Sequence, residues 1–245
     1  MKLSIVIPAY NEEKRIGDTL KEYIEFFSDK LKKDYEIFVV LNGCKDNTLD
    51  VVKKHDVKFL DIKEAIGKGG AIIEGFKLVE GDFIGFVDAD NATPARAFYD
   101  LYDKIKDNDG IIASRWIKGA KIGSKQPISR RIASRGFNIM IKILFGINLN
   151  DTQCGAKLFR KEVVKKVVDK LGITRWAFDI DLLYLMKRNG NKIIEVPTEW
   201  AEPGGSQLSV KKTVPEMFLA IGRLRLMYSP FKFVVKVYDK VFGNG

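Results

Sequence analysis

The stretch DFIGFVDADNATP, from Asp82 to Pro94, decides how the rest of this sequence is interpreted. It opens with an apolar run typical of a buried strand and ends in two aspartates one residue apart. Alternate side chains of an extended backbone point the same way, so Asp88 and Asp90 would share one space and repel unless a cation joins them. The stretch therefore indicates a divalent metal, Mg²⁺ or Mn²⁺, because hard oxygen ligands suit these ions.

Short β-rich runs alternate with helical patterns on the N-terminal side of that stretch. The runs LSIVIPAY, EIFVVLN and VKFLDI are separated from one another and from DFIGFVD by helical patterns through residues 20–27, near Val51 and after Gly70. This order predicts an α/β fold of the Rossmann-like, doubly wound kind, with a mostly parallel sheet. Amphipathic helical segments are expected at the C-terminal end.

Three polar segments follow the ends of predicted strands, namely PAYNEE (residues 8–13), LNGCKDN (41–47) and DADN (88–91). Ligands of doubly wound sheets gather at the carboxyl ends of the strands, so these segments are expected to meet on one rim. Asp90 has a second interpretation, as the cap of a helix that begins near Pro94. The position of the aspartate pair on the rim favours the metal.

Composition limits the classes of protein that this chain can represent. With 245 residues, 46% of them apolar, it can form one sizeable domain, and its net charge of +10 indicates anionic partners. Cys44 and Cys154 are far apart and no secretory pattern is present, so we expect free thiols and a cytoplasmic location. A single histidine, His55, argues against zinc and histidine triads. No apolar window is long enough to predict a membrane span.

Two further rim motifs have both structural and functional interpretations. IGKGGAI places Lys68 and Gly69 at a predicted helix start, where free N–H groups favour a phosphate, although a helix cap with a solvated lysine explains the motif equally well. In PAYNEE, Asn11 is interpreted as a helix N-cap. Capping does not require Pro8 and Tyr10, whose rigid and stacking surfaces suit a nucleoside, so the two uses are compatible.

The segment from Gly110 to Asn150 contains eight Lys or Arg residues and no acid. Such a segment is usually a solvated basic face, and nucleic-acid binding is its second meaning. Here the basic residues are mixed with FNIMIKILFGI, which lacks the aromatic spacing of a base-stacking platform. We therefore expect no nucleic acid, and a ligand with an anionic head and an apolar chain would use both the basic and the apolar side chains.

The C-terminal residues alternate lysines with apolar side chains at helical spacing, as in PFKFVVKVYDKVF. We divide the chain into a main α/β domain, residues 1–210, and a basic amphipathic tail, residues 211–245. The tail fits a helix that lies on an anionic membrane surface, and it fits equally a helix packed on the domain.

Taken in order, the motifs form a recognisable series: PAYNEE, NGCKDNT, GKGGAI, DADNAT, SRW, DTQCGAKLF, RWAFDIDLLY and GGSQL. The series resembles the family-two nucleotide-sugar glycosyltransferases of GT-A fold, and within them most closely the dolichyl-phosphate β-glucosyltransferases. The dolichyl-phosphate mannose synthases are cousins. The resemblance runs from Leu3 to about Leu208, and it implies that the aspartate pair binds the metal that carries the donor's diphosphate.

The resemblance also implies roles for individual residues. It assigns the metal to Asp88 and Asp90. The residues expected on the donor side are Pro8, Tyr10, Glu12, Asn42, Lys68, Gly69 and Asp88. The residues expected on the acceptor side are Arg115, Arg131, Ser134, Arg135, Gln153 and Ser206. The residues expected to take part in catalysis are Asp179, Asp181 and Arg131, the last because it would offset the repulsion between two anionic substrates.

One departure from the family pattern concerns the nucleobase. The family usually shows two aspartates where this chain has Leu41 and Asn42. An expected carboxylate contact to the base is therefore gone, although the Asn42 amide can still pair with a base edge. The choice between uracil and guanine stays open at this stage.

The implied reaction is the transfer of a hexose, with glucose from UDP-glucose as the leading expectation, to dolichyl or polyprenyl phosphate with inversion. The enzyme would act at the cytoplasmic face of the membrane. A phosphate monoester with a second pKa of about 6 attacks unaided at neutral pH. Two alternatives remain: mannose from GDP-mannose goes to the same lipid, or a saccharide hydroxyl is the acceptor, with Asp179 or Asp181 as general base.

Overall fold

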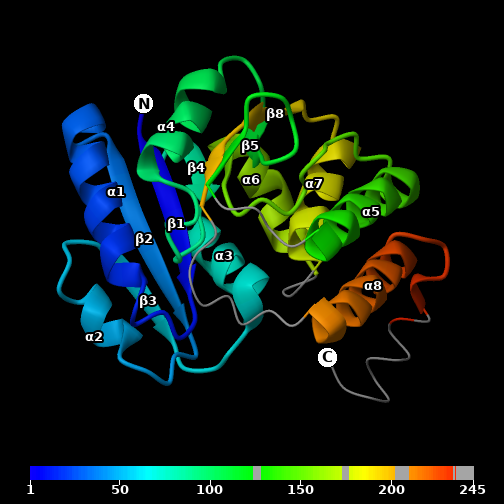
Figure 1. The fold of residues 1–245 in the computed structure, drawn as a ribbon, viewed down its shortest axis with the longest axis horizontal. Coiled ribbons are helices and arrows are strands. Elements are labelled where there is room, and N and C mark those ends of the chain that lie inside the picture. Colours follow the sequence, from blue (N-terminus) through cyan, green and yellow to red (C-terminus); the bar gives the residue numbers. More distant parts are fainter. Residues whose placement is uncertain (124–127, 173–176, 202–209, 234, 236–245) are drawn as a thin grey trace.

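A seven-stranded sheet in the order β3-β2-β1-β4-β7-β5-β8 runs through the molecule, with helices on both faces (Figure 1). The computed structural model describes residues 1–123, 128–172, 177–201, 210–233 and 235, and it describes no side chain within 128–133 and 210–214. The strands of the sheet are β1 (Leu3–Ala9), β2 (Tyr35–Asn42), β3 (Lys58–Ile62), β4 (Phe83–Phe86), β5 (Gly110–Ser114), β7 (Lys157–Arg160) and β8 (Ile193–Pro197).

The sheet is mostly parallel, as the sequence predicts. Strand β1 pairs in parallel with β2 on one side and β4 on the other, and β5 pairs in parallel with β8. Only β7, among these strands, is antiparallel to its neighbours, β4 and β5. By entering between them, β7 brings the loop before Lys157 against the end of β4, where Asp88 follows.

Helices cover both faces of the sheet, so its strands are apolar on both sides. The helices are α1 (Ile16–Leu31), α2 (Thr48–Val52), α3 (Gly67–Leu78), α4 (Ala95–Lys104), α5 (Ile128–Phe145), α6 (Lys161–Val167), α7 (Phe178–Arg188) and α8 (Val210–Met227), with a 3-10 turn at Val168–Lys170. In β1, Ile5 and Ile7 face the core beneath α1 and α4, whereas Val6 faces the core beneath α3 and α7. This two-sided burial explains the continuous apolar runs of the sequence.

The apolar segment KIIEVPTEW, residues 192–200, forms two strands. Strand β8 ends at Pro197, and β9 (Glu199–Trp200) pairs in a separate two-stranded sheet with β6 (Lys121–Ile122). The change of partner occurs at the buried Thr198, whose N–H donates to the carbonyl of Ser114 while its own carbonyl accepts from the Lys121 N–H. Periodicity within one segment does not reveal such a change of sheet.

Both helix caps considered from the sequence are wrong. Helix α1 begins at Ile16, and Asn11 lies before it with φ +54°, where its Oδ1 accepts from the Lys45 N–H at 2.8 Å. Asp90 accepts from the Ala92 N–H at 3.1 Å instead of capping α4. The first N–H of α4, that of Ala95, donates to Glu22 of α1 at 2.8 Å. Asn11 therefore connects two rim loops rather than beginning a helix.

Helix α8 packs on the body of the protein as well as facing outward. Its Ile221 and Leu224 are buried in the core, and the ring of Phe218 meets that of Phe137 of α5 at 6.4 Å. Just after α8, the Tyr228 hydroxyl donates to the buried Asp181 of α7 at 2.5 Å. The division of the chain at residue 210 stays a prediction, as does a membrane role for the tail.

We predict that Tyr228→Phe lowers the free energy of unfolding by about 1–3 kcal/mol, because a buried carboxylate loses a donor. The matched control is Tyr184→Phe, since the Tyr184 ring lies 5.0 Å from that of Tyr228 and makes ring contacts. This control should stay within about 0.5 kcal/mol of the parent in urea unfolding. Equal losses in the two variants would contradict the prediction.

Candidate active site

The rim loops that follow β1, β2 and β4 meet as the sequence predicts. Side-chain to backbone hydrogen bonds join them to one another and to the start of α3. These bonds are Lys45 N to Asn11 Oδ1 at 2.8 Å, Glu12 N to Thr48 Oγ1 at 2.7 Å, Ile66 N to Asn42 Oδ1 at 2.7 Å and Thr19 Oγ1 to the Ala89 carbonyl at 2.9 Å. The carboxyl ends of the parallel strands thus form one connected polar surface.

Asp88 and Lys68 form an ion pair at the centre of this surface. Asp88 follows β4, Lys68 lies in the first turn of α3, and Lys68 Nζ is 2.5 Å from Asp88 Oδ1. Partial burial alone would lower the pKa of Lys68, but the nearby carboxylates, that of Asp88 first, outweigh it and raise the pKa above its usual range. The motif GKGG therefore supplies a cation held beside the first aspartate.

The acidic side chains around that pair are crowded. Burial, followed by the charge of Asp88, raises the pKa of Asp90, and burial also raises the pKa of Glu12 although Arg15 opposes it. Arg15 binds Glu12 with both Nε and Nη2 at 2.7 Å. Carboxylates that repel in this way suit a divalent cation. Within the described residues no group of three His, Cys, Asp or Glu could hold one, and the assignment of a metal to Asp88 and Asp90 stays a prediction.

A second cation, Lys157 of β7, lies beneath the surface. Its side chain is fully buried, and its Nζ donates to Asp179 Oδ1 at 2.5 Å and to the Cys154 carbonyl at 2.6 Å. Negative and positive side chains therefore alternate along a row that runs from Asp88 through Lys68 and Asp179 to Lys157. Both lysines lie over the ring of Phe86, with Nζ 5.7 Å and 5.1 Å from its centroid.

The two aspartates of WAFDID have different surroundings, because residues two apart on a helix point about 200° apart. Asp179 faces Lys157, and its charge also acts on Lys68. Asp181 is fully buried on another side of α7, where its oxygens accept from the Gly172 N–H at 3.0 Å and the Tyr228 hydroxyl at 2.5 Å. Asp181 therefore has structural partners in this geometry, and its role as a base stays a prediction. It holds the segment after α8 against α7.

Arg115 is paired more completely than an acceptor ligand would need to be. Its backbone N–H and Nε donate to Asp151 Oδ2 at 2.9 and 2.7 Å, and its Nη2 donates to Oδ1 at 2.9 Å. The guanidinium also lies over the Trp200 ring, 5.4 Å from its centroid. Arg115 therefore fixes the loop that begins at the buried Asp151, which is a positioning role the sequence did not predict.

The other described residues expected on the acceptor side lie on or near α5. Ser134 and Gln153 are half-buried, and Arg135 is exposed with its guanidinium 5.4 Å from the centroid of the Trp116 ring. The side chain of Arg131 and all of Ser206 lie outside the described residues. Two of the cations expected on the acceptor side therefore have described side chains. Of these, Arg115 is paired with Asp151 and Arg135 stacks on Trp116.

The donor-side residues differ in how they are used. Pro8 and the half-exposed Tyr10 lie at the end of β1 on the rim, as expected. Asn42 is buried, and its carbonyl oxygen already accepts from Ile66, so its first role is to fix the loop before α3. Gly69 is a packing residue, because a Cβ there would lie 2.6 Å from Phe178. Its place in the motif reflects the close approach of α3 to α7.

Sequence reasoning missed Lys157 and Gly155, which both lie in DTQCGAKLF. A Cβ at Gly155 would lie 2.0 Å from Asp88 Oδ2, so any larger residue here would displace the carboxylate that is predicted to hold the metal. Lys157 had a detectable signal, since a lysine inside the apolar run AKLF needs a buried counter-charge. The identity of that partner, Asp179, is not visible in the sequence.

Comparison with solved structures identifies the fold class of the protein. Glucosyl-3-phosphoglycerate synthase from Mycobacterium tuberculosis, crystallised with Mn²⁺, uridine diphosphate and phosphoglyceric acid, superposes with a TM-score of 0.68. The match covers 91% of this chain and 78% of that one at 16% identity, so it shows the fold alone. The fold class is that of the GT-A glycosyltransferases, as the sequence predicted.

Sequence comparison specifies the family. The family model described as glycosyl transferase family 2 matches residues 4–168. The dolichyl-phosphate beta-glucosyltransferase of Dictyostelium discoideum is 35% identical over 243 residues, covering 92% of this chain and 74% of the relative. The protein of the same name from Drosophila melanogaster is 35% identical over 231 residues, covering 85% and 70%. The chain belongs to glycosyl transferase family 2.

We predict that Lys157→Met destabilises the protein by about 3–5 kcal/mol, because Asp179 is left as a largely buried charge without its partner. The double variant Lys157→Met/Asp179→Asn removes both charges and should recover at least half of that loss. Denaturant unfolding of the parent, both single variants and the double variant gives the coupling energy. Additive losses would show that the two residues do not act as a pair.

We also predict that Gly155→Ala reduces glycosyl transfer at least ten-fold, since the added methyl group displaces the Asp88 carboxylate. The control is Gly222→Ala in α8, where a Cβ would meet nothing within 4 Å. The control should retain activity. Retained activity in Gly155→Ala, with unchanged Mn²⁺ affinity by calorimetry, would refute the proposed contact.

Proposed function

We propose that the protein is an inverting glycosyltransferase that moves glucose from UDP-glucose to dolichyl or another polyprenyl phosphate. The observation that carries the proposal is the Lys68–Asp88 pair at the start of α3, with Asp90 beside it. A diphosphate placed there meets the ammonium group of Lys68 and the free N–H groups of the helix start. The names of the relatives support glucose and dolichyl phosphate as the transferred sugar and the acceptor.

The residues of this site fit a divalent cation, because two crowded carboxylates lie next to the predicted diphosphate position. Asp88 and Asp90 would hold it. A bound Mg²⁺ or Mn²⁺ supplies Lewis-acid stabilisation of the negative charge that develops on the departing nucleoside diphosphate. Lys68 contributes to the same stabilisation through its three N–H donors. The departing group then leaves without needing a proton.

The acceptor is best supported as a phosphate rather than a sugar hydroxyl. A hydroxyl acceptor needs a general base, and Asp179 is the aspartate of WAFDID that faces the charge cluster. Protonation of Asp179 would leave Lys157 as a fully buried cation without its counter-charge. A phosphate monoester needs no base, because its own ionisation supplies the attacking oxygen. The Lys157–Asp179 ion pair therefore favours a lipid phosphate over a sugar hydroxyl as the acceptor.

We place the reaction at the cytoplasmic surface of a membrane, where the protein binds peripherally. No helix in the described ranges is long and apolar enough to cross a bilayer. Two neighbouring helices instead expose large apolar side chains, of which Ile143 of α5 and Leu219 of α8 are 76% and 74% exposed. The basic character of the chain would direct these helices to anionic lipids.

We predict that Asp88→Asn or Asp90→Asn lowers transfer at least a hundred-fold while leaving the thermal unfolding midpoint within a few degrees of the parent. The assay supplies radiolabelled UDP-glucose, Mn²⁺ and a polyprenyl phosphate, and it counts the label extracted into organic solvent. Asp100→Asn, which removes an exposed acid on α4, is the matched control and should be active. Full activity of the parent enzyme in EDTA would refute the requirement for a metal.

The product of the same assay distinguishes the acceptors. Label in an acid-labile glycosyl phosphate supports the proposed acceptor, whereas label in an acid-stable glycosidic linkage supports a saccharide hydroxyl. Substituting labelled GDP-mannose for UDP-glucose tests the alternative donor directly. A preference for GDP-mannose would change the proposed sugar to mannose and the proposed base to guanine, and it would leave the proposed acceptor unchanged.

A further inference from the structure

Lys68 and the predicted divalent cation are directed to the same oxygen of Asp88. Lys68 Nζ lies 2.5 Å from Asp88 Oδ1, in a pair whose side chains are 41% and 34% exposed. The loop before β7 packs against the other oxygen, because a Cβ at Gly155 would lie 2.0 Å from Oδ2 and 3.2 Å from Oδ1. Oδ1 is therefore the oxygen farther from that loop, and it is the one that Lys68 already contacts.

The ammonium group of Lys68 lies among three carboxylates. Besides Asp88, the charges of Asp179 and Asp90 act on it. Its Nζ also lies 5.7 Å from the centroid of the Phe86 ring, at a distance where the ring face attracts a cation. These groups stabilise Lys68 in place, so a divalent cation that approaches Asp88 and Asp90 meets a positive charge close to its own position.

The side chain of Lys68 can change partner although its backbone is fixed. Lys68 belongs to the first turn of α3, which begins at Gly67. The next residue, Gly69, packs so closely on α7 that a Cβ there would lie 2.6 Å from Phe178. The start of α3 therefore cannot shift without losing this contact. The flexible four-carbon stem of a lysine still allows Nζ to move between nearby anions.

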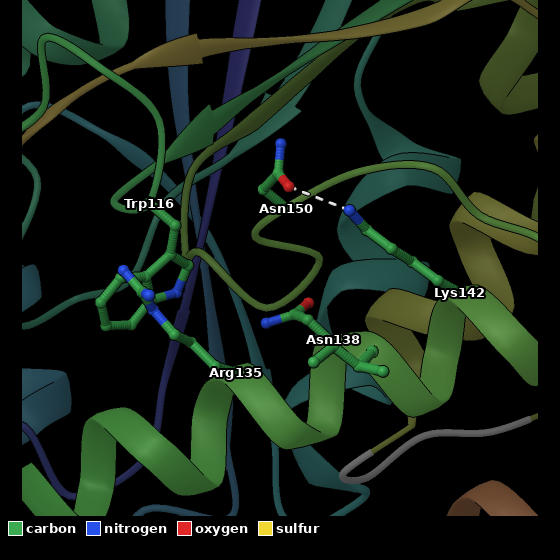
Figure 2. Close-up of a pocket in the computed structure, with 6 residues that line it drawn as sticks. Trp116, Arg135, Asn138, Lys142 and Asn150 are labelled. Atoms are coloured by element: carbon green, nitrogen blue, oxygen red, sulfur yellow. Dashed lines mark hydrogen bonds between the residues drawn. The ribbon is translucent and has the colours of Figure 1, made fainter.

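Two other lysines of this half of the molecule are held differently. Lys157 is fully buried and bound to Asp179, so it has no room to change partner. Figure 2 shows Lys142 in a pocket of about 250 Å³ on α5, where its Nζ donates to the amide oxygen of Asn150 at 2.9 Å. In contrast to both, Lys68 is partly exposed and is paired with a predicted metal ligand.

We infer that Lys68 competes with the divalent cation for Asp88, and that a nucleoside diphosphate relieves this competition by binding Lys68. The diphosphate is the ligand that can draw Lys68 away, because it brings negative charge to the free N–H groups at the start of α3. Asp88 Oδ1 is then open to the divalent cation. The inference rests on the proposed function for the identity of the diphosphate, and it adds how binding at that site is regulated.

The competition makes the two ligands depend on each other. A divalent cation without a diphosphate has to displace Lys68 from Asp88 against the repulsion of like charges. A diphosphate without a divalent cation takes Lys68 but then faces the carboxylates of Asp88 and Asp90. When both bind, the diphosphate neutralises Lys68 and the divalent cation neutralises the aspartates. Each ligand therefore raises the affinity for the other, and by the same factor.

The test measures equilibrium binding to the whole chain, so it does not depend on turnover. Isothermal calorimetry gives the Mn²⁺ affinity without nucleotide and with saturating UDP, after correction for the Mn²⁺–UDP complex that forms in solution. Lys68→Met should raise the Mn²⁺ affinity without nucleotide about five- to ten-fold, because a competing positive charge is removed. The factor by which UDP raises the Mn²⁺ affinity should fall to a similar extent.

Two variants serve as controls for charge and for structure. Lys68→Arg keeps a cation beside Asp88, so it should bind Mn²⁺ without nucleotide no more tightly than the parent. Lys77→Met removes a lysine of α3 that is also 41% exposed and is paired with Glu74 at 2.8 Å. This variant should match the parent in both measurements. Thermal unfolding of every variant checks that it is folded.

The inference fails if Lys68→Met binds Mn²⁺ without nucleotide no more tightly than Lys77→Met does. It also fails if Lys68→Arg binds Mn²⁺ as tightly as Lys68→Met, or if UDP raises the Mn²⁺ affinity equally in the parent and in Lys68→Met.

A failure of the proposed function gives a different result. A protein that transfers no glucose, but whose Lys68→Met variant gains Mn²⁺ affinity and loses the effect of UDP, refutes the transfer and keeps the competition. A protein that transfers glucose, but whose Lys68→Met variant binds Mn²⁺ like the parent, keeps the transfer and refutes the competition.

Discussion

The alternation of charge from Asp88 through Lys68 and Asp179 to Lys157 is the constraint on which the site depends. A rim that gathers several carboxylates is unstable unless cations are interleaved with them. Lys68 neutralises the outer aspartate, and Lys157, buried beneath, neutralises the inner one at 2.5 Å. The cluster is thereby charged and pre-arranged before any substrate arrives. A base role for Asp179 would disrupt it, which is why the reaction that fits is one with a self-ionised acceptor.

Close backbone approach is the second requirement, and it follows from the antiparallel β7. This strand lies between β4 and β5, so its preceding loop passes directly beside Asp88. Gly155 allows that passage, and Gly85 lets β7 pack on β4, because a Cβ there would lie 2.4 Å from the Lys157 carbonyl. The insertion of one strand in the opposite direction therefore delivers both the buried lysine and the space for the carboxylate.

The two halves of the proposed reaction use different parts of the fold. The donor side is built on the carboxyl ends of β1, β2 and β4, where position is set by the sheet. The residues that we propose for the acceptor side lie on α5 or near it. Helix α5 combines cations with exposed aliphatic side chains, and this combination suits a ligand that has an anionic head and an apolar chain.

The sequence alone was sufficient to predict the alternating α/β fold, the shared rim, Lys68 at a helix start and the aspartate pair after β4. These features depend on local pattern, on strand order and on family motifs read in series. Only the tertiary structure showed that Lys157 pairs with Asp179, that Arg115 pairs with Asp151, and that Asp181 accepts a hydrogen bond from Tyr228. The physical reason is that a charged side chain takes its role from its nearest counter-charge or hydrogen-bond partner, and these partners lie 22, 36 and 47 residues away along the chain.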